Sequence, residues 1–117
     1  MKKILLTIFA ACMTLLVYAD DKPSFPGGEE ALKAYISQHT QYPEIAKENG
    51  VEGIVVVGFI VTTDGNIKDS KVVKFIDPDL EREALRVVNG MPAWIPAEVE
   101  GVAVEAPAKV DIPFILE

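Results

Sequence analysis

A run of apolar residues at positions 53–61 predicts a β-strand in the middle of the chain. Because successive side chains of a strand point to opposite faces, the run divides into two sets. One face carries Val55, Val57, Phe59 and Val61, and the other carries Ile54, Val56, Gly58 and Ile60. Both sets are almost entirely apolar, which makes this the most strongly predicted strand of the chain.

A hairpin is predicted directly after this strand. Thr63-Asp64-Gly65-Asn66 is typical of a tight turn, because Asp-Gly readily adopts the positive φ that such turns require. The return strand is expected over residues 67–75. Its apolar residues Ile67 and Val72 differ in parity, so we expect a β-bulge near Asp69-Ser70 to shift the register.

Apolar side chains at intervals of three and four residues predict a helix over residues 29–39. The positions with this spacing are Leu32, Tyr35, Ile36 and His39. Phe25, just before the helix, is expected to pack back onto its start. A second, short helix is predicted over residues 44–48, because Pro43 suits a helix start and Asn49-Gly50 suits a helix end.

A third helix is predicted after Asp77-Pro78, with Asp77 as the N-cap and Pro78 at the first helical position. Its apolar stripe consists of Leu80, Ala84, Leu85, Val88 and Met91, and its water-facing residues are Glu81, Arg82, Glu83 and Arg86. Asn89-Gly90 is expected to end it. The following residues 91–96 are expected to cross the domain in extended form and to place Trp94 over the edge of the core.

The last segment, residues 102–116, alternates between apolar and polar positions and predicts one long strand. Two of its residues, Pro107 and Pro113, share parity, so their backbone nitrogens face the same side of the strand. Proline has no N–H to donate to a neighbouring strand, so that side is expected to be a free edge of the sheet. Lys109, Val110 and Asp111 then lie in the middle of the open edge.

These elements predict an α+β fold, a small antiparallel three-stranded sheet with two main helices packed on one face. The opposite face of the first strand would expose Ile54, Val56 and Ile60. An exposed apolar patch commonly marks an interface with another molecule. The alternative is that the terminal tail or the long stem of a lysine covers this patch.

The first 19 residues are typical of a secretory signal peptide, with cleavage expected after Ala19. Met1-Lys2-Lys3 is basic, residues 4–19 carry no charge, and residues 17–19 begin and end with small side chains. Two alternatives are an uncleaved membrane anchor, for which the segment is short, and lipidation of Cys12. The expected division is therefore a signal peptide (1–19), a short connecting segment (20–28) and one domain (29–117).

Composition excludes several classes of function. The chain has 117 residues and a formal charge of -7, which argues against binding of nucleic acid. Removing the leader would remove the single cysteine, so the mature chain could form no disulfide. One histidine and the lack of a Ser/His/Asp, Cys/His or metal-spaced set predict that the protein is not an enzyme and holds no metal or cofactor.

An ordered set of residues resembles the carboxy-terminal domain of the TonB energy-transducer family. The set is Tyr42-Pro43 with Ala46, Gly53-x-Val55-x-Val57-x-Phe59-x-Val61, Asp64-Gly65 with Ile67, Leu80 with Ala84-Leu85, Trp94-x-Pro96, and Ile112-x-Phe114-x-Leu116. Phe25-Pro26-Gly27-Gly28-Glu29 also looks like the start of this domain in members from Bacteroidetes-type bacteria. The resemblance covers nearly all of residues 25–116.

The resemblance implies a periplasmic domain that binds the TonB box, a short extended peptide of an outer-membrane transporter. It implies binding by β-strand addition to the terminal edge strand, which agrees with the edge expected from the two prolines. The contact residues implied are Lys109, Val110 and Asp111 on that strand, with His39, Thr40 and Gln41 before Tyr42. A retained leader would add the inner-membrane motor complex as a partner.

Two functional hypotheses follow from the sequence. In the first, the domain is a periplasmic binding module for transporter peptides in energy-dependent transport. In the second, it is a structural or assembly protein that forms homodimers or docks on a larger complex through Ile54, Val56 and Ile60. From Ala19 to Glu29 the chain can span at most roughly 35 Å, so we expect that it does not transmit force by itself.

Overall fold

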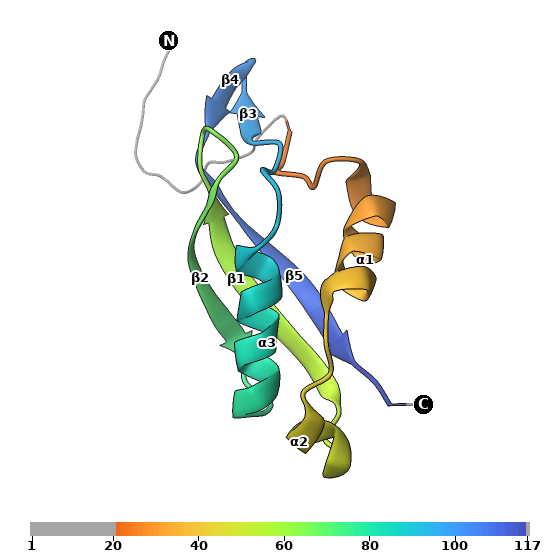
Figure 1. Ribbon diagram of the computed structural model, residues 1–117. Coiled ribbons are helices and arrows are strands. Elements are labelled where there is room, and N and C mark those ends of the chain that lie inside the picture. The colour runs from red at the N-terminus through yellow and green to blue at the C-terminus, as the bar shows by residue number, and fades with distance from the viewer. Residues whose placement is uncertain (1–20, 117) are drawn as a thin grey trace.

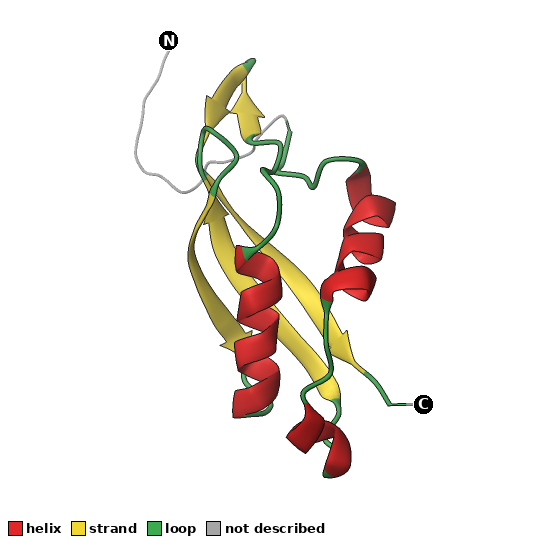
Figure 2. Cartoon of the chain, viewed as in Figure 1, coloured by secondary structure: helices red, strands yellow, loops and turns green. Residues whose placement is uncertain are grey.

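Three antiparallel strands form the main sheet, in the order β2-β1-β5 (Figure 1). They are β1 (Gly53–Val61), β2 (Ile67–Lys74) and β5 (Ala106–Phe114). The structure is a computed structural model that describes residues 21–116. Helices α1 (Gly28–His39) and α3 (Pro78–Asn89) lie on one face of this sheet, and the short helix α2 (Glu44–Glu48) lies beyond one end of it (Figure 2). The predicted α+β class is confirmed, and the leader predicted over residues 1–19 lies outside the described residues.

The hairpin between β1 and β2 forms as predicted. Gly65 has a φ of 88°, its N–H donates to the carbonyl of Thr62 over 2.9 Å, and the N–H of Thr62 donates to Asn66 over 2.8 Å. The predicted bulge is also present, because Gly58 lies opposite Lys71 whereas Ile60 lies opposite Lys68. Two steps along β1 therefore face three steps along β2. A second shift, near Val73, was not predicted.

Strand β5 is an edge strand, as the positions of its prolines predict. It pairs with β1 from Gly53 opposite Phe114 to Val61 opposite Ala106, and within residues 21–116 it pairs with no other strand. Pro107 lies opposite Ile60 and Pro113 opposite Ile54. Both prolines therefore direct their nitrogens away from β1.

The prediction of one continuous strand over residues 102–116 is wrong at its beginning. Residues Val102–Val104 form a separate strand, β4, which pairs with β3 (Ala97–Val99) in a small two-stranded sheet. The chain turns between them at Glu100 and Gly101, whose φ values are 51° and 78°. Alternation continues through Glu105 in the sequence, but the strand breaks there and β5 begins at Ala106.

Helix α3 begins as the sequence predicts. The Oδ2 atom of Asp77 accepts hydrogen bonds from the backbone N–H of Asp79 (2.9 Å) and of Leu80 (3.2 Å). These bonds satisfy donors that the first turn of a helix leaves unpaired. The buried residues of α3 are Leu80, Ala84, Val87 and Val88, whereas Leu85 and Met91 of the predicted stripe are only partly buried.

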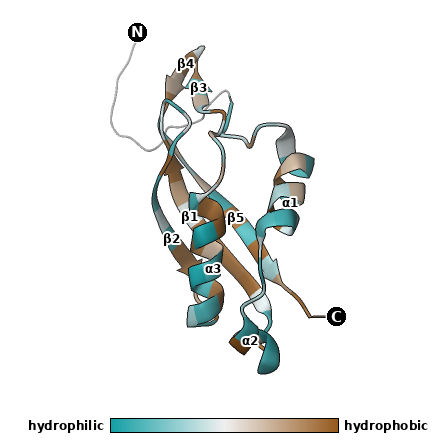
Figure 3. Cartoon of the chain, viewed as in Figure 1, coloured by the Kyte–Doolittle hydropathy of each residue, from teal (hydrophilic) through white to brown (hydrophobic). Residues whose placement is uncertain are grey.

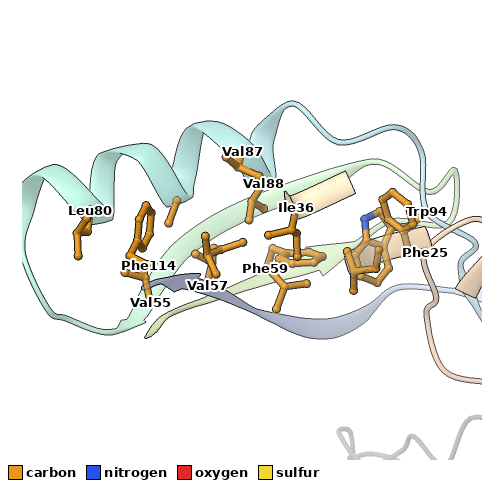
Figure 4. Close-up of a cluster of buried hydrophobic side chains, with 14 of the residues drawn as sticks. Phe25, Ile36, Val55, Val57, Phe59, Leu80, Val87, Val88, Trp94 and Phe114 are labelled. Atoms are coloured by element: carbon orange, nitrogen blue, oxygen red, sulfur yellow. The ribbon is translucent and has the colours of Figure 1, made fainter. Parts of the chain in front are cut away.

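The core lies between the helices and the sheet and is shown in Figure 4. One end is an aromatic cluster, in which the ring of Trp94 meets Phe25 at 5.8 Å and Phe59 at 5.2 Å, both edge-on. This confirms that Trp94 covers the core, whereas the ring of Phe25 meets Trp94 and Tyr35 (5.6 Å), in the later part of α1, and not only the start of that helix. Figure 3 shows the hydrophilic residues of α3 on the outer surface of that helix. Within the described part of the chain, no helix is long and apolar enough to span a membrane.

Candidate functional site

The free edge of β5 presents backbone donors and acceptors at its centre. In an antiparallel pair, alternate residues bond to the partner strand and the others direct their N–H and C=O groups away from it. Pro107 and Pro113 cannot belong to the bonded set, so Lys109 and Asp111, which share their parity, also point outward. Along this edge, Lys109 and Asp111 each direct an N–H group outward. The outward carbonyl groups come from these two residues and from Pro107 and Pro113.

The side chains at this edge divide by face. Val110 is buried on the side of the helices, whereas Lys109 and Asp111 are exposed on the opposite face. The structure therefore places the three predicted edge residues together, with two charges on one face and an apolar side chain on the other. A strand added here would meet both kinds of surface.

Two hollows lie along the edge, and α1 forms one wall of each. The first, with a volume of about 740 Å³, lies between the start of β5 and the start of α1, and its walls include Leu32, Trp94 and Ala108. The second, of about 640 Å³, lies farther along β5, and its walls include Ile36 and Thr40. Helix α1 and the edge strand thus form the two sides of a groove.

Of the residues predicted before Tyr42, only Thr40 lines this groove. The ring of His39 stacks on Tyr35, with 4.0 Å between the ring centres. Gln41 faces α3 instead, where its backbone N–H donates to Oε2 of Glu83 over 2.7 Å. The structure therefore brings Thr40 to the same hollow as Asp111 and directs His39 and Gln41 elsewhere.

Glu83 and Arg86 of α3 hold this segment in place. Nε and Nη2 of Arg86 donate to the two carboxylate oxygens of Glu83, over 2.8 and 2.7 Å, and Nη2 also donates to the carbonyl of His39 over 2.8 Å. The side chain of Glu83 is only 12% exposed, so the prediction that it faces water is wrong. The sequence gives no sign of this contact because it joins residues 42 positions apart.

The pKa of Glu83 reflects the same contacts. Burial alone would raise it, but hydrogen bonds from Arg86 and from the backbone of Gln41 outweigh burial, so the pKa of Glu83 lies below its usual value. A carboxylate whose pKa is lowered by folding stabilises the folded state above its unfolded pKa. That stabilisation is lost as the pH falls through the folded pKa.

We expect Glu83→Gln to lower the free energy of unfolding at pH 7 by about 1 kcal/mol or less, because the guanidinium of Arg86 is half exposed and solvent screens the pair. The difference between wild type and variant should shrink as the pH falls below about 4, where the free carboxylate becomes protonated. Urea denaturation at a series of pH values measures it. Glu48→Gln, at an exposed carboxylate, is the control, and a pH-independent difference would contradict the prediction.

The helix-free face of the sheet is partly covered. Ile54 is 43% exposed, whereas Val56 and Ile60 are half-buried. The side chain of Val73, from β2, lies over Gly58 in the middle of this face, and the stem of Lys109 lies close to the same glycine. An interface at Ile54, Val56 and Ile60 therefore stays a prediction, with only Ile54 well exposed.

Within residues 21–116, no group of three or more histidine, cysteine, aspartate or glutamate side chains is arranged to hold a metal ion. The features that distinguish the edge are instead its backbone groups and its groove. The walls contributed by Leu32 and Trp94 were expected only as core residues, because the position of α1 beside β5 cannot be read from spacing along the chain.

Comparison with known proteins gives a consistent result. Residues 38–116 match the family described as "Gram-negative bacterial TonB protein C-terminal". Over 77 residues the chain is 34% identical to protein TonB of Helicobacter pylori. The matched segment covers 65% of this chain and 27% of that protein. The same protein of a second H. pylori strain gives 34% identity and 28% coverage of its length. The chain thus spans about a quarter of the length of the curated relatives it matches.

Two solved structures are similar in fold. The solution structure of the H. pylori TonB C-terminal domain matches with a TM-score of 0.57 and 28% sequence identity, covering 79% of this chain and 87% of that one. The solution structure of the Pseudomonas aeruginosa TonB C-terminal domain matches with a TM-score of 0.52 and 29% identity, covering 67% of this chain and 79% of that one.

Proposed function

This chain belongs to the TonB C-terminal domain family, and from that premise we propose that its domain binds an extended segment of an outer-membrane transporter by β-strand addition to β5. The family is not enzymatic, so the function is one of binding. The guest segment forms a fourth strand beside β5. Its binding serves energy-dependent transport across the outer membrane.

The observation that carries this proposal is the free edge of β5. Lys109 and Asp111 present N–H and C=O groups that β1 does not use, on a strand whose inner side is already paired with β1. Strand addition fills such an edge with backbone hydrogen bonds and therefore places weak demands on the sequence of the guest. The groove beside α1 supplies room for its side chains.

The location we propose is the periplasm, which is typical of this domain family. Cleavage of the leader after Ala19 would release the domain there, whereas a retained leader would anchor it at the inner membrane. The residues that decide between these forms lie outside the described part of the chain. Strand addition at β5 is available to the domain in either form.

Replacing Asp111 with proline is expected to weaken binding of transporter peptides at least tenfold, about 1.4 kcal/mol. The substitution removes one of the two outward N–H groups and places a ring where the guest would pair. It leaves the bonds to β1 intact because the nitrogen of residue 111 points away from that strand. Fluorescence titration with labelled TonB-box peptides from the same organism measures the change.

Asp111→Ala is the matched control, because it removes the same side chain and keeps the N–H group. We expect it to weaken binding by no more than about threefold, since exposed charges contribute little. Circular dichroism establishes that both variants are folded. Equal affinities for Asp111→Pro and wild type, or no binding by wild type at millimolar peptide, would rule the proposal out.

A further inference from the structure

We propose that the free edge of β5 selects its guest strand by four side chains, two large apolar ones four residues apart that enter the groove beside α1 and two opposite charges between them on the helix-free face. This inference rests on strand addition to β5, the function proposed above. It adds the chemical class of the guest, an extended peptide of the form apolar-charge-small-charge-apolar. Three features of the edge carry it.

The first feature is the register of the edge. A guest strand pairs through the outward groups of Lys109 and Asp111, about 4.8 Å from β5. Side chains directly opposite each other on paired strands lie on the same face. Guest residues opposite Lys109 and Asp111 therefore lie on the helix-free face, and those opposite Ala108, Val110 and Ile112 point toward α1.

The second feature is the pair of hollows, which lie at different points along β5. The walls of the first include residues 105–109, and those of the second include Asp111 and residues 113–115, so Val110 lies between them. The first exists where the core-facing side chains of β5 are the small Ala106 and Ala108, beneath Leu32. The guest residue opposite Ala108 enters this hollow.

The second hollow is lined by Asp111 and Pro113, on either side of Ile112, and by Ile36 and Thr40 across from them, so the guest residue opposite Ile112 faces it. This residue lies four positions along the guest from the residue in the first hollow, roughly 13 Å in an extended strand. The residue between them, opposite Val110, lies between the two hollows and is small. This spacing sets the two apolar positions of the guest.

The third feature is the order of charges on the edge. Lys109 favours an acidic guest residue opposite it, and Asp111 favours a basic one. In an antiparallel guest the basic residue comes first in the sequence, and in a parallel guest the acidic residue comes first. The preferred order of charges therefore also shows whether the guest strand runs parallel or antiparallel to β5.

Two peptides of identical composition test the charge pattern, one containing Leu-Lys-Ala-Glu-Leu and the other Leu-Glu-Ala-Lys-Leu. We expect one of them to bind the purified domain about fivefold or more tightly than the other. The double variant Lys109→Glu, Asp111→Lys should reverse this preference. Equal binding of the two peptides by wild type, or an unreversed preference in the double variant, would overturn the charge pattern.

The apolar positions are tested by size complementarity. Replacing the leucine opposite Ala108 with alanine is expected to weaken binding to wild type by about tenfold. The variant Ala108→Leu fills the first hollow, so it should bind the leucine and alanine peptides equally. Replacing the leucine that faces the second hollow should still weaken binding to this variant. Equal binding of the leucine and alanine peptides to wild type would overturn the pocket assignment.

The Asp111→Pro variant separates this inference from the function on which it rests. If this variant binds neither peptide, and wild type binds peptides of either charge order and either side-chain size equally, then strand addition holds and the selection proposed here fails. If it binds both peptides as wild type does, strand addition itself fails.

Discussion

Replacing Phe59 with alanine is expected to lower the free energy of unfolding by about 3–5 kcal/mol. Phe59 is 3% exposed in the middle of β1, and its ring packs edge-on against Trp94. Removing it both loses the burial of a large apolar group and leaves a cavity beneath Trp94. Small domains are stable by only about 5–15 kcal/mol, so this one change removes a large share of the total.

Guanidinium denaturation followed by far-ultraviolet circular dichroism measures this loss. Phe75→Ala is the matched control, because the same side chain is removed from a residue that is 62% exposed. We expect the control to change the free energy of unfolding by about 0.5 kcal/mol or less. A loss at Phe59 no greater than that at Phe75 would show that the core is not packed as described.

Replacing Gly65 with alanine is expected to lower the free energy of unfolding by about 3 kcal/mol or more. Two effects add at this position. Its φ of 88° is unfavourable for any residue with a side chain, and a Cβ atom there would overlap the carbonyl oxygen of Trp94. At this residue the hairpin between β1 and β2 contacts the extended residues around Trp94, because the N–H of Trp94 donates to the carbonyl of Gly65 over 2.8 Å.

Gly101→Ala separates these two effects. Gly101 has a φ of 78°, and no atom lies within 4 Å of the place a Cβ would take. Only the backbone conformation is then unfavourable, which costs about 1 kcal/mol. Thermal denaturation of the two variants gives the difference, and equal losses would mean that the close approach to Trp94 is not important.

The sequence predicted the elements that depend on neighbouring residues. Asp64-Gly65 indicated the hairpin, the unequal parity of Ile67 and Val72 indicated the bulge, and Asp77-Pro78 indicated the start of α3. The free edge of β5 could be predicted because a missing N–H group is a property of proline itself. It constrains pairing in any fold that contains the strand.

The features that the sequence did not predict depend on tertiary contacts. Strands β3 and β4 have three residues each, too few to show a period, and the alternation of β5 extends through β4 without interruption. The contact of Glu83 with Gln41 and the groove beside α1 both depend on how helices lie relative to one another. Periodicity predicts which face of a helix is buried, and it does not give the lateral position of that helix over a sheet.

The spacing of Pro107 and Pro113 also bears on solubility. Unpaired sheet edges are the places where proteins stack into fibrils, because each added chain offers a new edge to the next. Here a stacking chain would find donors over only the short stretch between two residues that cannot donate. A ladder so brief disfavours repeated stacking at this edge of the sheet.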